Sequence, residues 1–204
     1  MRLALISLIF SLFARAPLYG QVAPHAKENN LPFTFGGGFS RFYTDWSGYE
    51  SGPTAWLDCN FQNLPSVLDG VGVEVEGRDL NYGRTGDIPK LRESTMGGGV
   101  IYTFHQIPIP YFHFYGKYLV EFGRAYVSSP SLNISPQAVR SVIYTPGTGI
   151  EVRTWHNVWV HGEYEWQYWR TNLRDVPSGA ISMSPNGFTI GLSYHLPGIH
   201  SRTR

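Results

Sequence analysis

The stretch from Val158 to Trp169 constrains the fold most, because apolar and polar side chains alternate along it for twelve residues. A period of two is the pattern of a β-strand, in which successive side chains point to opposite faces. One face carries only apolar or small side chains: Val158, Val160, Gly162, Tyr164, Trp166 and Tyr168. The other face carries polar side chains between two tryptophans: Trp159, His161, Glu163, Glu165, Gln167 and Trp169. In a soluble sheet the apolar face would line a core, whereas in a membrane barrel it would meet lipid.

The composition of the whole chain favours strands over helices. Of the 204 residues, 15% are aromatic and 23 are glycine, and both kinds of residue are poor helix formers. The length predicts one domain, and the balance of 16 basic against 15 acidic residues gives no reason to expect a nucleic-acid partner. Cys59 is the only cysteine, so an internal disulfide is excluded.

The first twenty residues differ from the rest of the chain. Met1 and Arg2 are followed by an almost wholly apolar run over 3–14, which predicts a secretory signal peptide at 1–20 with cleavage after Gly20. A membrane anchor is the alternative, but the run is shorter than the ~20 residues that a spanning helix needs. A polar lead then occupies 21–31.

Eight segments show strand-like alternation: 33–44, 54–61, 70–80, 91–104, 111–124, 139–154, 158–169 and 187–196. We expect Pro146 and Gly147 to form a bulge in the sixth. The first, third, fifth and seventh connections are predicted to be longer than the others. An even strand count with short turns at one end and long loops at the other is typical of an outer-membrane barrel with both termini on the periplasmic side. The predicted barrel covers 32–196, and a tail covers 197–204.

The two faces of these strands predict which side chains meet lipid and which fill the barrel. The side chains predicted to face lipid are Phe112, Phe114, Tyr118, Val158, Val160, Tyr164, Trp166, Phe188, Ile190, Leu192 and Tyr194. A polar network is predicted inside the barrel from Glu74, Glu76, Arg78, Lys117, Glu121, Glu151, Arg153, His161, Glu163 and Glu165. Aromatic residues near strand ends predict an interfacial girdle: Tyr43, Trp46, Trp56, Tyr111, Tyr126, Trp155 and Trp169.

A soluble β-sandwich would place the same charges in water, and it remains the alternative. The large aromatic residues of the apolar faces and the signal peptide favour the membrane barrel. The interior of an eight-stranded barrel is only wide enough for side chains to fill, so we expect a packed ionic interior rather than a pore.

The chain resembles the small eight-stranded outer-membrane β-barrel proteins of the OmpA-like and OmpX-like kind. The resemblance rests on the segments 33–39, 144–153, 161–165 and 187–196, and it covers roughly 32–196. It implies an all-β, eight-stranded, antiparallel, up-and-down transmembrane barrel. Members of this family usually end on an aromatic residue that the assembly machinery reads. Here the chain continues past Leu196, and Tyr194 is the nearest substitute.

Three motifs are of the kinds that can carry chemistry. The glycine triplets at 36–38 and 97–99 lie inside strand patterns and open no helix, so they are interpreted as positions where strands bend rather than as phosphate loops. A metal site at His161, Glu163 and Glu165 would need ligands from other strands, since same-face neighbours lie ~7 Å apart. The same ~7 Å spacing argues against a hydrolase built on Ser193 and His195, because a nucleophile and its base must lie ~2.6 to 3.2 Å apart.

The sequence therefore predicts an integral outer-membrane protein with a structural, envelope-integrity or adhesive role, whose long loops are the interaction surface. No enzymatic activity, cofactor or metal is expected. The expected partners are outer-membrane lipid and the barrel-assembly machinery, and the chain is expected to be a monomer. A lipid A-modifying enzyme and a soluble, secreted β-barrel binding protein remain the alternatives.

Overall fold

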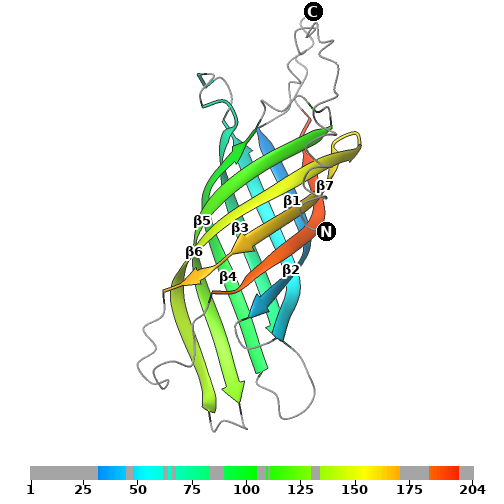
Figure 1. Ribbon diagram of the computed structural model, residues 1–204. Coiled ribbons are helices and arrows are strands. Elements are labelled where there is room, and N and C mark those ends of the chain that lie inside the picture. Colours follow the sequence, from blue (N-terminus) through cyan, green and yellow to red (C-terminus); the bar gives the residue numbers. More distant parts are fainter. Residues whose placement is uncertain are drawn as a thin grey trace, which may run out of the picture.

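The computed structural model describes residues 32–44, 48–61, 64–65, 68–82, 90–104, 109, 111–129, 134–170 and 184–197. The strands are β1 (Phe33–Thr44), β2 (Gly48–Asn60), β3 (Val71–Tyr82), β4 (Lys90–Thr103), β5 (Phe112–Ser129), β6 (Ile134–Trp155), β7 (Val158–Trp166), β8 (Tyr168–Trp169) and β9 (Asn186–His195) (Figure 1). The predicted signal peptide, the polar lead, Trp46 and the tail from residue 198 onward lie outside the described residues. Within the described residues, no helix is long and apolar enough to cross a membrane.

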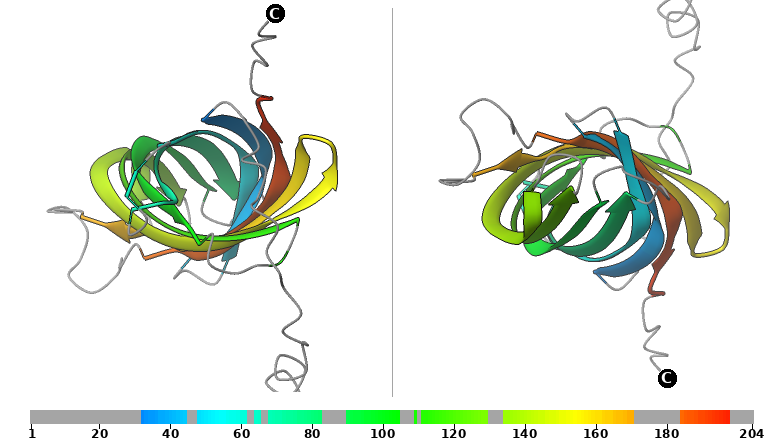
Figure 2. Two further views of the ribbon diagram at one scale, coloured as in Figure 1. Left: turned by 90° about the horizontal axis from the view of Figure 1, so that it is seen from above. Right: turned by 90° about the horizontal axis from the view of Figure 1, so that it is seen from below.

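The strands close into a barrel. From β1 to β7 each strand pairs antiparallel with the next, β7 pairs with β9, and β1 pairs with β9 along Thr34↔His195 to Tyr43↔Asn186. Seen along its axis, the sheet encloses a single interior (Figure 2). The two residues of β8 continue β7 after Gln167 and pair with β6, so β7 and β8 together make the strand predicted at 158–169. The predicted fold class, an eight-stranded antiparallel up-and-down barrel, is confirmed.

The two ends of the barrel are distinguished by their connections. At the terminal end, β1 begins and β9 ends, and residues 61–70, 104–111 and 156–157 join consecutive strands. At the hairpin end, residues 45–47, 83–89, 130–133 and 170–185 join them. The β5–β6 hairpin extends furthest at the hairpin end, which lies at the bottom of Figure 1.

Charged side chains point into the barrel, and large apolar side chains point outward. Among the described residues, nine carboxylates and two cations are buried: Glu50, Asp58, Glu74, Glu76, Glu93, Glu121, Glu151, Glu163, Glu165, Arg78 and Lys117. Twenty-eight large apolar or aromatic side chains are exposed, among them Phe122 at 72% and Leu192 at 55%. A soluble protein buries such residues and exposes its charges. The distribution is that of a barrel surrounded by lipid.

The predicted alternation of long and short connections is wrong. The second strand begins at Gly48 rather than at residue 54. β5 ends at Ser129 rather than at residue 124, and β6 begins at Ile134 rather than at residue 139. The first and fifth connections are therefore short, at 45–47 and 130–133. Glycine and proline at 48–53 indicated a loop, but β1 pairs with this segment from Thr44↔Gly48 onward. Cross-strand pairing overrides the local preference of these residues.

The bulge predicted at Pro146 and Gly147 is also wrong. The register of β6 against β5 is continuous there, with Pro146 opposite Tyr118 and Gly147 opposite Lys117. The register shifts instead between Arg153 and Trp155, beside the turn into β7. Gly147 has a packing role, because a Cβ atom there would lie 3.0 Å from Glu165 Cγ and 3.2 Å from Lys117 Cε. Its missing side chain leaves room for both charged side chains.

Candidate functional site

Lys117 lies at the centre of a charge network inside the barrel. Its Nζ lies 2.7 Å from Glu74 Oε1, 2.8 Å from Glu163 Oε1 and 3.1 Å from Glu165 Oε1, and it also donates to Glu76. The four glutamates belong to β3 and β7, each of which is separated from β5 by one intervening strand. Alternation along three strands therefore brings one ammonium group into contact with four carboxylates.

Arg78 extends this network toward the hairpin end. Its Nη2 lies 2.6 Å from Glu165 Oε2 and also pairs with Glu76. The guanidinium group lies over the ring of Phe42, 4.8 Å from the centroid. Both cations are almost fully buried, so the carboxylates around them are their main source of compensation. Ion pairs therefore stabilise this part of the interior, alongside fully buried apolar side chains such as Leu80, Leu119 and Ile143.

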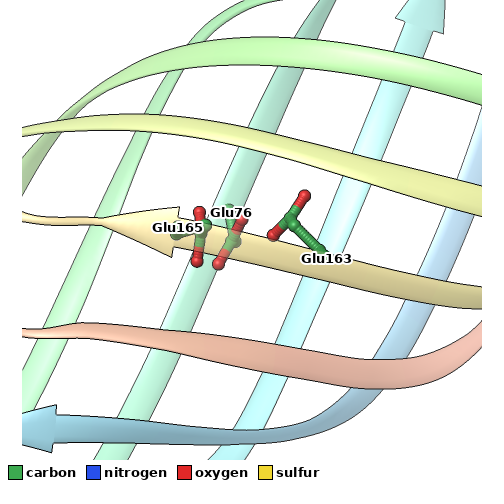
Figure 3. A group of neighbouring side chains, drawn as sticks. All are labelled: Glu76, Glu163 and Glu165. Atoms are coloured by element: carbon green, nitrogen blue, oxygen red, sulfur yellow. The ribbon is translucent and has the colours of Figure 1, made fainter. Parts of the chain in front are cut away.

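Three of the carboxylates have a geometry that would suit a metal ion. Ligand atoms of Glu76, Glu163 and Glu165 lie within 4.8 Å of one another (Figure 3). The Lys117 ammonium, however, contacts all three of these side chains. It occupies the position in which a cation would bind, so this arrangement is a lysine-centred network rather than a metal centre.

A second cluster lies nearer the terminal end and is organised by Glu151. Ser193 donates to Glu151 Oε1, and His195 Nε2 lies 3.2 Å from Glu151 Oε2. His161 Nδ1 lies 3.4 Å from Glu151 Oε1. A hydrolytic triad needs the histidine between the hydroxyl and the acid. Here the carboxylate lies between the serine and His195, an arrangement that fixes side chains in place and does not activate a nucleophile.

Arg153 was predicted to belong to the interior network, and the structure places it elsewhere. Its Nε donates to the carbonyl of His156 in the β6–β7 turn, and its guanidinium group lies 5.9 Å from the centroid of the Tyr111 ring. It lies opposite Trp159 at the terminal end. Alternation predicts which face of the strand a side chain lies on, and the prediction for Arg153 used this alone. It took no account of the position of Arg153 along the barrel axis. Lys117 and Arg78, rather than Arg153, are the cations within the glutamate network.

Two of the tryptophans assigned to the interfacial girdle lie inside the barrel. Trp56 is buried, and its ring centroid lies 4.2 Å from that of His161. Its indole occupies the place of a side chain at Gly36, where a Cβ atom would come within 2.3 Å of the ring. Trp169 is also buried and donates from Nε1 to Gln167 Oε1 at 2.8 Å. Proximity to a strand end was the wrong criterion, because both residues share the inward face of their strands.

Sequence reasoning did not place three buried carboxylates, Glu50, Asp58 and Glu93, in the polar network. Glu50 fell in a segment interpreted as a loop. Asp58 and Glu93 fell in predicted strands on the face opposite Leu57 and Met96, so the signal was present. All other predicted members of the network except Arg153 lie buried within the barrel.

The residues predicted to face lipid lie on the outer surface. Seven are exposed, namely Tyr118, Val160, Tyr164, Trp166, Phe188, Ile190 and Leu192, and four are half-buried, namely Phe112, Phe114, Val158 and Tyr194. Tyr43, Tyr111, Tyr126 and Trp155 of the predicted girdle are exposed as well.

The packed interior predicts that the purified protein will form no large, steady pore in planar bilayers. Lys117, Arg78 and their glutamates extend into the lumen from β3, β5 and β7 and contact one another there, and the interior of an eight-stranded barrel is only wide enough for side chains to fill. The measurement is single-channel recording after reconstitution. Reproducible conductance in the nanosiemens range would show that the network opens and that the barrel is a channel.

Comparisons with known proteins find likeness in structure alone. No protein-family model and no curated protein sequence matches the chain. Neisserial surface protein A matches with a TM-score of 0.57 at 12% identity, over 79% of this chain and 94% of that one. OprG of Pseudomonas aeruginosa matches with a TM-score of 0.54 at 10% identity, over 83% and 98%. Ail, the attachment invasion locus protein of Yersinia pestis, matches with a TM-score of 0.51 at 15% identity, over 80% and 96%.

These matches confirm the resemblance at the level of the fold. The chain has the closed, eight-stranded, antiparallel barrel of small outer-membrane proteins, and it is similar to these structures over nearly their whole length. At such low identity, the likeness carries no information on ligand or activity.

Proposed function

We propose that the chain is an integral outer-membrane barrel protein of a diderm bacterium, with a structural, envelope-integrity or adhesive role. The observation that carries the proposal is the inside-out distribution of its side chains. From Phe112 to Phe122, every side chain on the outer face of β5 is apolar or aromatic, apart from one glycine. This stretch has the length of ~9 to 11 residues that a tilted membrane strand requires. The ionic interior supports a role that depends on the outer surface and the connections rather than on transport.

The hairpin end faces the exterior in this proposal. With an even number of strands, β1 begins and β9 ends at the terminal end, which would face the periplasm. The β5–β6 hairpin continues beyond Phe122 through paired residues as far as Ser129↔Ile134. A paired hairpin that projects from the membrane offers a preformed surface to a partner. The adhesive role rests on this hairpin; Ail, an attachment invasion locus protein, has the same fold.

The remaining partners follow from the same assignment. Outer-membrane lipid covers the apolar band, and the barrel-assembly machinery inserts the chain as a monomer. We expect Tyr194, on the last strand, to serve as the aromatic signal for assembly. The rival enzyme reading has little support, because the Ser193 hydroxyl donates to Glu151 and lies inside the barrel.

The test is to express the full chain in a diderm bacterium, separate its membranes, and run each fraction on gels with and without boiling. We expect the protein in the outer-membrane fraction, with faster migration before boiling because the compact barrel resists the detergent until it is heated. Recovery in the periplasm or the medium, with no difference on boiling, would overturn the proposal and favour a soluble binding protein.

A further inference from the structure

Charge is segregated between the two faces of the barrel. Nine carboxylates of the described strands point inward, and Asp79 is the one acidic side chain on the outer face of those strands. Five exposed arginines lie on that outer face toward the hairpin end. Arg41 on β1 lies over the Tyr49 ring, and the other four lie on the adjacent strands β4 and β5, on β6, and directly after β8. We call Arg92, Arg124, Arg140 and Arg170 the arginine cluster.

Two members of the arginine cluster are direct cross-strand partners. Arg124 on β5 lies opposite Arg140 on β6. Side chains in such pairs have Cβ atoms ~5 Å apart, and like charges in this position destabilise a sheet. Asp79 does not relieve the pair, because it receives two hydrogen bonds from Arg92, from Nε at 3.0 Å and from Nη2 at 2.6 Å. An anion between Arg124 and Arg140 would turn this repulsion into attraction.

Arg124 and Arg140 lie directly beyond the apolar band. On β5, Arg124 follows the last residue of the band, Phe122. On the neighbouring strand, Arg140 lies one outward-facing position beyond Val142, whose carbonyl accepts a hydrogen bond from the Arg170 backbone N–H at 3.1 Å. This is the level at which the hydrocarbon gives way to charged headgroups.

We propose that Arg124 and Arg140, flanked by Arg92 and Arg170, bind the phosphate groups of phosphorylated lipids in the outer leaflet. Each guanidinium group presents a planar fork of donors that matches a phosphate in two hydrogen bonds. The site rests on the proposed membrane location, because only there does lipid phosphate lie against the outer face of the strands. A lipid whose headgroup carries two phosphates would suit a cluster spread over four strands.

The experiment titrates the refolded mature barrel, in neutral detergent micelles, with diphosphoryl lipid A and follows the midpoint of thermal unfolding. We expect the midpoint to rise in the unmodified protein, and dephosphorylated lipid A to produce no such rise. In the double variant Arg124→Gln/Arg140→Gln, half-saturation should require about 25-fold more lipid, at about fivefold for each arginine. Without lipid A its midpoint should be unchanged or higher, since a repulsive pair has been removed.

The control variant is Arg153→Gln, which removes an arginine at the terminal end and should leave the lipid response unchanged. An equal response to phosphorylated and dephosphorylated lipid, or an unchanged response in the double variant, would overturn the inference while leaving the membrane assignment intact. Stabilisation by a soluble sulfated polysaccharide and not by lipid A would assign the cluster to a soluble polyanion and would likewise overturn it. Failure of the unmodified chain to fold in micelles would refute the membrane assignment, and the inference with it.

Discussion

Replacing Lys117 by methionine is expected to lower the free energy of unfolding by about 3 to 5 kcal/mol, because it removes one partner from a buried ion network. Methionine preserves most of the length of the side chain, so the loss reports on charge rather than on volume. Glu74, Glu163 and Glu165 would remain buried without the ammonium group that lies 2.7 to 3.1 Å from each. The measurement is urea unfolding of the refolded barrel in phosphatidylcholine vesicles, followed by tryptophan fluorescence.

The matched control for this variant is an ion pair on the outer face. Arg92 and Asp79 have side chains that are 61% and 36% exposed, and Arg92→Gln should cost no more than about 1 kcal/mol. Adding Glu74→Gln and Glu163→Gln to Lys117→Met should restore part of the lost stability, since fewer carboxylates then lack a cation. If Lys117→Met costs no more than Arg92→Gln, the interior charges do not hold the barrel together.

Replacing Tyr118 by arginine is expected to cost about 2 to 4 kcal/mol in a bilayer, because it places a charge near the middle of the apolar band. Tyr118 lies on the outer face of β5 and is 51% exposed. In a soluble protein, an exposed substitution of this kind changes stability by only about 0.5 kcal/mol in either direction. Unfolding in vesicles measures the difference.

The same strand supplies the control for this substitution. Tyr126 lies on the same face of β5 but beyond Arg124, outside the apolar band, so Tyr126→Arg should cost about 0 to 1 kcal/mol. The two variants differ in their height along the barrel, and Tyr126→Arg also places an arginine opposite Arg92, so any repulsion there works against the expected difference. Equal costs for both would mean that no band of low polarity surrounds the strand.

Alternation predicted the faces of the strands because it depends only on the period of the side chains. The stretch 158–169 shows this most clearly, since Glu163 and Glu165 lie inside and Tyr164 and Trp166 lie outside, as predicted. The same alternation would have placed Trp56 and Trp169 on the inward face, had it been preferred to their proximity to strand ends. The fold class followed from the strand count together with this alternation.

Partners across the barrel could not be predicted in the same way. Contact between Lys117 and glutamates of β3 and β7 depends on register and on the stagger of the closed sheet, which no local pattern encodes. The same limit misplaced Arg153, whose face is consistent with the interior but whose height is that of the terminal end. The extended hairpin of β5 and β6 was missed because serine, proline and asparagine around 127–137 indicate a loop, whereas the two strands pair as far as Ser129↔Ile134.

The central claim is that the outer face of the barrel needs lipid, and refolding of the mature chain tests it most directly. The unfolded chain would be diluted from urea into plain buffer, into detergent micelles and into phosphatidylcholine vesicles. Circular dichroism and migration on unboiled gels then report folding in each. We predict a β-rich, heat-modifiable barrel in micelles and vesicles, and aggregation in buffer because the exposed apolar side chains associate. A chain that folds equally well in plain buffer would contradict the account, since its apolar face would then be stable in water.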